Sequence, residues 1–139
     1  MSLRRYGLIA QSLFYLISGV NHFWHSGTYR PLMPGHYSNP DLMIYLSGAA
    51  ELLGGTGLLA PIPKIQRAAA LGVMATLVVF LDVHLFMIGH ADRFPGIPVW
   101  LLWARLPMQG LLIAWAWTYF RKPEQLYRSR NTTALDRNA

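Results

Sequence analysis

Apolar residues gather in four long segments of the chain, and shorter polar segments separate them. The apolar segments cover about 6–24, 41–60, 68–89 and 97–120. Each has roughly the 20 residues that an α-helix needs to cross the hydrocarbon core of a bilayer, and each is much longer than an ordinary β-strand. The pattern therefore predicts an all-α fold, in the form of an integral membrane four-helix bundle with one span per segment.

Proline and glycine mark the connections between these segments. Residues 25–40 have the composition of a loop, 61–64 form a Pro-Ile-Pro-Lys turn, and 92–96 form a second turn that ends in Pro-Gly. We expect a single four-span transmembrane domain over 1–120, followed by a polar, basic cytoplasmic tail over 121–139. We assign no chemistry to the tail.

Composition supports the membrane interpretation and removes several classes of function. Of the 139 residues, 53% are apolar and only 13% are charged, whereas about a quarter of the residues in a soluble domain are charged. The formal charge of +6 comes from basic residues beside the apolar segments, so we expect no nucleic-acid partner. The chain has no cysteine, which excludes disulfides, thiolate nucleophiles and cysteine-ligated metal clusters.

The distribution of Lys and Arg predicts the orientation. Nine of these residues lie beside one set of span ends (Arg4, Arg5, Lys64, Arg67, Arg121, Lys122, Arg128, Arg130 and Arg137), and only Arg30 and Arg93 lie beside the other set. Because basic residues stay on the cytoplasmic side, both termini are expected there, in a multi-pass protein of the cell (inner) membrane. The lipid bilayer is then one partner, and a membrane protein partner or a homo-oligomer is left open.

Three ionisable side chains fall at membrane depth, where an unpaired charge costs several kcal/mol. Counted at about 1.5 Å per residue, Glu51, Asp82 and Arg105 lie in one layer of the outer half of the bundle. We interpret Glu51 and Arg105 as a structural ion pair between the second and fourth spans. On the third span, Asp82 and His84 are about 200° apart, and we favour Asp82 as the residue that faces inward.

A polar stripe on the first span faces the same layer. Gln11, Tyr15, Ser18, His22 and His25 recur at helical spacing. On the fourth span, Arg105 and Gln109 are four residues apart and share a face. We therefore expect a polar cavity that opens outward, with these ligand-binding residues: Glu51, Arg105, Asp82, His22, Tyr15 and Gln109.

Two other uses of these side chains stay open. Imidazole and carboxylate groups suit Zn, Fe or Mn, so His22, His25, Glu51 and Asp82 are a candidate set of metal ligands. Haem ligation by His22 and His84, from different helices, is a further option.

The sequence resembles the DoxX-like family of small four-span membrane proteins, and the resemblance runs from about Tyr6 to Trp117. It is carried by Gly19-Val-Asn-His-Phe23, Met33-Pro34, Ser47-Gly-Ala-Ala-Glu-Leu52, Gly57-Leu-Leu59, Arg105-Leu-Pro-Met-Gln109 and Trp115-Ala116. The resemblance implies a four-helix membrane fold. Some members of that family are associated with quinone-linked oxidation of sulfur compounds or with other redox membrane complexes. The resemblance implies a similar association for this chain.

Three functional hypotheses follow. The first is a redox-associated subunit whose cavity binds a quinone-like or other small amphipathic ligand, with quinone as the candidate cofactor. The second is a non-enzymatic assembly or accessory protein whose buried charges are structural. The third is a metal-binding membrane protein that uses histidine and carboxylate ligands. The sequence assigns no catalytic residue and does not decide whether the protein is an enzyme.

Overall fold

The computed structural model describes residues 2–124, and this part of the chain is helical and contains no strand. The long helices are α1 (Leu3–Trp24), α3 (Pro40–Leu58), α4 (Pro63–Val79) with α5 (Leu81–Gly89), and α6 (Val99–Arg121). Short helices occupy the connections: α2 (Ser26–Tyr29), η1 (Arg30–Leu32) and η2 (Ala91–Arg93). The predicted all-α fold is confirmed for the described residues. The predicted tail lies outside them from residue 125 onward.

Local sequence explains where the long helices begin. The Ser2 hydroxyl accepts a hydrogen bond from the Arg5 amide at 3.3 Å and caps α1, and Asn39 caps α3 through the Leu42 amide at 3.1 Å. Prolines stand at the first helical positions of α3 and α4, where a missing N–H costs nothing. These signals are local in the sequence and do not depend on a tertiary contact.

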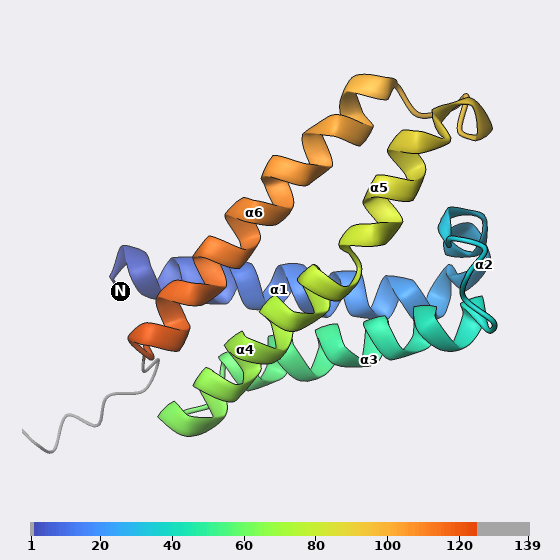
Figure 1. Ribbon diagram of the computed structural model, residues 1–139. Helices are drawn as coiled ribbons and strands as arrows, with labels where there is room; N and C mark the ends of the chain where they lie inside the picture. The colour runs from blue at the N-terminus through green and yellow to red at the C-terminus, as the bar shows by residue number, and fades with distance from the viewer. Residues whose placement is uncertain (1, 125–139) are drawn as a thin grey trace, which may run out of the picture.

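The helices pack as two pairs that cross each other. α3 lies between α1 and α4, while α6 packs against α4 and α5. Figure 1 shows α1 and α3 running side by side and α4, α5 and α6 crossing them at an angle, so that α5 and the start of α6 diverge from α1. The main apolar core lies where α1, α3, α4 and α6 meet; it includes Leu8, Leu58, Val73 and Ala116.

Glycines of α3 set the close packing within this arrangement. A Cβ atom at Gly55 would lie 2.9 Å from the backbone oxygen of Ser12 on α1, and one at Gly57 would lie 2.7 Å from the Ala69 Cβ on α4. Small residues allow helices to approach in this way. The glycine-rich face of α3 is therefore used inside the chain, and α1 and α4 already occupy it.

The third predicted segment is interrupted. α4 begins at Pro63, earlier than the predicted start at residue 68, and ends at Val79, and α5 begins at Leu81. Taken through this break, Pro63–Gly89 is long and apolar enough to cross a membrane, and so is Val99–Arg121. These are the two candidate spans among residues 2–124.

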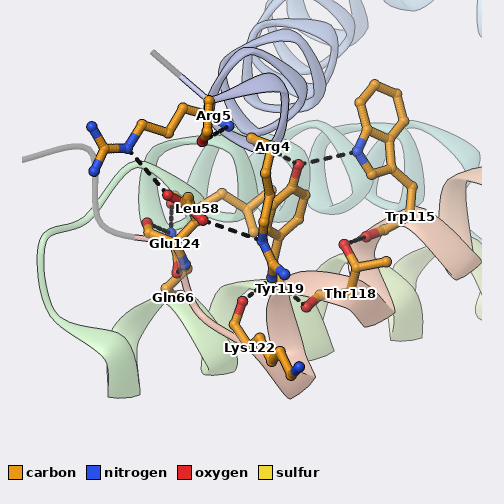
Figure 2. A network of polar contacts seen from close by, with 10 residues as sticks. Arg4, Arg5, Leu58, Gln66, Trp115, Thr118, Tyr119, Lys122 and Glu124 are labelled. Carbon is orange, nitrogen blue, oxygen red and sulfur yellow. Dashed lines mark hydrogen bonds and ion pairs between the residues drawn. The ribbon is translucent and has the colours of Figure 1, made fainter.

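A polar network ties the start of α1 and the segment after α6 to the start of α4, as Figure 2 shows. Glu124 forms ion pairs with Arg4 at 3.3 Å and Arg5 at 3.1 Å. The buried Gln66 side chain donates to the carbonyls of Leu58 at 2.6 Å and Glu124 at 2.9 Å, and accepts from the Glu124 amide at 2.6 Å. This cluster cannot be predicted from local sequence, because its members are far apart along the chain.

Candidate functional site

A cavity of about 320 Å³ lies between the two helix pairs. Its walls are mostly apolar, but four ionisable side chains line it: His22 from α1, Glu51 from α3, His84 from α5 and Arg105 from α6. Tyr29, Leu32 and Met33, from the connection between α1 and α3, also line it. Such a volume is at the lower end of the range for small-molecule sites.

Close contact between α1 and α3 brings His22 and Glu51 together. A Cβ atom at Gly19 would lie 2.8 Å from the carbonyl oxygen of Gly48, and one at Gly48 would lie 2.8 Å from the His22 Cβ. With the two backbones this close, Nδ1 of His22 lies 3.2 Å from Oε2 of Glu51. Both residues were predicted at the cavity from the sequence, but their contact was not.

The proton of the His22 ring is held on Nδ1. This nitrogen faces the Ser18 carbonyl at 2.9 Å as well as the Glu51 carboxylate, and both groups are acceptors. The ring also stacks on Tyr29, with centroids 4.3 Å apart. In the neutral imidazole, Nε2 is therefore an acceptor. Oε2 of Glu51 is buried and has no well-aligned hydrogen bond among residues 2–124.

The break at Phe80 positions His84. Since α4 ends at Val79, the carbonyls of its last turn need donors from elsewhere. Nε2 of Gln109 on α6 donates to the Leu77 carbonyl, which fixes the amide so that its Oε1 faces Nδ1 of His84 at 2.6 Å. His84 then donates from Nδ1, and its neutral ring keeps Nε2 as an acceptor.

Arg105 approaches the cavity from α6 without a carboxylate partner. Its Nη1 lies 3.2 Å from Sδ of Met87, and a thioether is a weak acceptor. No ion pair of Arg105 occurs within the described residues. The predicted ion pair between Glu51 and Arg105 is therefore wrong: both side chains line the same cavity, but α3 and α6 lie in different helix pairs.

Asp82 is placed differently from the prediction. Its Oδ2 accepts from the Tyr37 hydroxyl at 2.8 Å and lies 3.1 Å from Nε2 of His36, and Asp82 does not line the cavity. The prediction that Asp82 faces inward beside Glu51 and Arg105 is wrong, because His84 takes that place. The prediction assumed one unbroken helix over 68–89. The break at Phe80 changes which residues of α5 face the cavity.

Contacts to Asp82 anchor the connection that lines part of the cavity. Burial, with the hydrogen bond to Asp82 as a second cause, raises the pKa of Tyr37 to about 12. The phenol therefore stays a donor at all ordinary pH values. Leu32 and Met33 line the cavity only a few residues earlier, so this contact holds the lining segment against α5.

Two other predicted site residues do not reach the cavity. Tyr15 is 1% exposed but belongs to the apolar core, where its hydroxyl accepts from Gln11 at 3.2 Å. His25 is exposed, and its ring bonds to the Asn21 side chain at 2.7 Å. The predicted polar stripe of α1 therefore divides between the core, the cavity and the surface.

The predicted metal ligands are not assembled. His22 and Glu51 are in contact, but His25 and Asp82 bond to other groups, as described above. Within residues 2–124, no three His, Cys, Asp or Glu side chains lie close enough together to hold a metal ion.

One comparison with known proteins finds a match. A family model described as "Domain of unknown function (DUF8561)" matches residues 11–120, a range that includes every ionisable residue of the cavity. No curated protein and no solved structure matches the chain.

Proposed function

The chain belongs to the DUF8561 family, and we propose that it is a four-span membrane protein whose cavity binds a small amphipathic ligand of quinone-like size. The observation that carries this proposal is the cavity itself. Ionisable side chains from α1, α3, α5 and α6 meet in it, between apolar walls. Groups of this kind at membrane depth generally mark ligand, ion or proton sites, because their burial is costly.

Exposed apolar residues support the membrane part of the proposal. Ile17 on α1, Leu53 on α3 and Leu111 on α6 lie in mid-helix and are 69%, 75% and 71% exposed. In each candidate span, only 17% of the apolar window is buried, whereas a core helix of a soluble protein would be mostly buried. Lipid is the solvent that suits these surfaces. The asymmetry of Lys and Arg supports cytoplasmic termini.

The two sides of the cavity support a ligand with polar groups at both ends. His22 and Glu51 come from the α1–α3 pair, and His84 and Arg105 come from the α5–α6 pair. A ring that carries an oxygen at each end, as a quinone or quinol does, can contact both sides while its apolar faces pack on residues such as Phe80 and Met87.

The redox association stays a proposal that rests on the DoxX-like resemblance. An accessory role in which the buried charges serve packing alone is the competing function. The contact between His22 and Glu51, which joins two neighbouring helices, is the observation that favours it.

Filling the cavity tests the proposal. Val83 lines the cavity, whereas Val79 is 56% exposed on α4 and does not, so Val83→Phe and Val79→Phe are matched substitutions. We expect one-ring and two-ring probes, among them 1,4-naphthoquinone, to bind the purified protein saturably in calorimetric titrations. Val83→Phe should weaken that binding about tenfold or more, as overpacking of a small site predicts, and Val79→Phe should not. Absence of binding, or equal binding to both variants, would favour the accessory role.

A further inference from the structure

Two polar groups in the cavity have opposite needs. Oε2 of Glu51 is a buried acceptor that makes no well-aligned hydrogen bond among residues 2–124, although Nδ1 of His22 lies 3.2 Å away. Arg105 is a cation whose contact within the same residues is a thioether sulfur. A buried polar group left without a partner is costly. Each group therefore indicates what a bound ligand must supply: a donor for Glu51 and an acceptor for Arg105.

An anionic group on the ligand would be the best partner for the Arg105 guanidinium. Guanidinium groups bind carboxylates through two parallel hydrogen bonds, and such charge-assisted pairs are about twice as strong as neutral hydrogen bonds. The carboxylate that could balance Arg105 from within the cavity is Glu51, but it lies against His22 at 3.2 Å. A neutral carbonyl oxygen would satisfy Arg105 less well than an anionic one.

A hydroxyl group on the ligand would supply the Glu51 carboxylate with a hydrogen-bond donor. Nδ1 of His22 is directed at the Ser18 carbonyl at 2.9 Å, so its proton is largely used there. In the neutral form of each ring, Nε2 of His22 and Nε2 of His84 are further acceptors. The cavity thus combines one cation with several acceptors.

From these unmet needs, and resting on the proposed function, we infer that the ligand is a small amphipathic hydroxy acid. Its carboxylate binds Arg105, and its hydroxyl donates to Glu51 on the opposite side of the cavity. This orientation keeps the ligand's negative charge away from the Glu51 carboxylate. The apolar body between the two groups has one or two rings, because a cavity of about 320 Å³ is at the lower limit for small-molecule sites.

Matched ligands test the inference on the unaltered protein. The probes are 6-hydroxy-2-naphthoate, its neutral amide 6-hydroxy-2-naphthamide, 2-naphthoate without the hydroxyl, and 1,4-naphthoquinone. In calorimetric titrations, we expect the dissociation constant of the hydroxy acid to be lower than that of the amide by about tenfold or more, as charge-assisted bonding predicts. Removal of the hydroxyl should also weaken binding.

Variants of Arg105 locate the acid. Arg105→Met should abolish the preference for acid over amide, whereas Arg105→Lys should keep much of it. Arg93→Met, at an exposed position in η2, should leave it unchanged. If Arg105→Met does not fold, the Lys variant and the ligand series still decide the matter.

The outcomes separate the inference from the proposed function. Suppose that the naphthoquinone binds and that Val83→Phe weakens this binding, but that the acid binds no more tightly than the amide. The inference is then overturned and the proposed function stands. An acid preference that persists in Arg105→Met also overturns the inference. If no probe binds, both proposals fail.

Discussion

At the residue scale, Gly48 decides how closely α1 and α3 approach, and with that whether His22 can reach Glu51. A Cβ atom at this position would lie 2.8 Å from the His22 Cβ and 3.0 Å from the Gly19 carbonyl oxygen. Because backbone cannot move aside as a flexible side chain can, we expect Gly48→Ala to destabilise the protein by about 1–3 kcal/mol. Thermal unfolding of the purified protein in detergent measures the effect.

Gly72→Ala is the matched control for this prediction. Gly72 lies inside α4, and a Cβ atom there would meet nothing within 4 Å. Alanine is a better helix former than glycine by about 0.5–1 kcal/mol, so this variant should be as stable as the parent protein or more so. Equal melting temperatures for the two alanine variants would show that the glycine contact does not limit the packing of α1 and α3.

The residue scale also shows how far sequence reasoning reaches. A fixed rise per residue placed Glu51 and Arg105 at similar depth, and both do line one cavity. Depth along a helix says nothing about which helices are neighbours, so the predicted pair between them failed. The contact of Glu51 with His22 depends on the Gly19 and Gly48 approach. Gly48 stands three residues before Glu51, but the helix that packs against it could not be derived from one sequence.

At the scale of elements, the break between α4 and α5 is held by a side chain from another helix. Nε2 of Gln109 donates to the Leu77 carbonyl, and its Oε1 accepts a hydrogen bond from Nδ1 of His84. No proline or glycine occurs between residues 73 and 88, so local sequence gave no sign of the interruption. The error in placing Asp82 and His84 follows from this, because the faces of α5 depend on a tertiary contact.

Gln109→Leu should therefore loosen the break more than any other part of the protein. Leucine has a similar size but leaves the Leu77 carbonyl and the His84 ring without their partner, at a cost of about 1–3 kcal/mol. Hydrogen exchange should accelerate at the amides of residues 80–85. The amides in the middle of α1 serve as the internal control. Exchange that is unchanged around Phe80 would mean that α4 and α5 hold their break without Gln109.

The polar network around Gln66 and Glu124 predicts which of two substitutions costs more stability. Gln66 is fully buried and makes three hydrogen bonds to the backbone, so Gln66→Ala should cost about 1–3 kcal/mol. Glu124→Ala removes ion pairs with the partly exposed Arg4 and Arg5 but keeps the backbone bonds to Gln66. Such pairs contribute about 0–1 kcal/mol. Thermal melts should rank the variants in this order, and the reverse order would assign the stability of this end to charge.

At the scale of the whole molecule, the crossing of two helix pairs explains both the core and the cavity. Where α1 and α6 cross, Leu8 and Ala116 pack in the core, and Gln11 donates to the Leu112 carbonyl at 3.2 Å. Beyond the crossing, α5 and the start of α6 diverge from α1, as Figure 1 shows. The cavity lies between the diverging pairs, and the connection anchored at Asp82 lines part of it. Sequence periodicity predicts the helices, but the angle between the pairs depends on tertiary packing.

The proposed four spans make a prediction about sides of the membrane that two spans do not make. If only Pro63–Gly89 and Val99–Arg121 cross, residues 2, 38 and 64 share one side and residue 96 lies on the other. If all four helices cross, residues 38 and 96 share the outer side. Residue 38 alone therefore separates the two topologies.

Single cysteine substitutions can show on which side of the membrane each position lies, because the chain has no cysteine of its own. Ser2→Cys, Ser38→Cys, Lys64→Cys and Gly96→Cys all alter exposed positions at helix ends or connections. With a membrane-impermeant maleimide added to intact cells, we expect labelling at 38 and 96, and labelling at 2 and 64 only after the membrane is opened. Labelling at 96 without 38 would reduce the spans to two. The cavity would then stand in a mostly water-facing protein, and the cost of burying Glu51 and Arg105, from which its function is argued, would be far smaller.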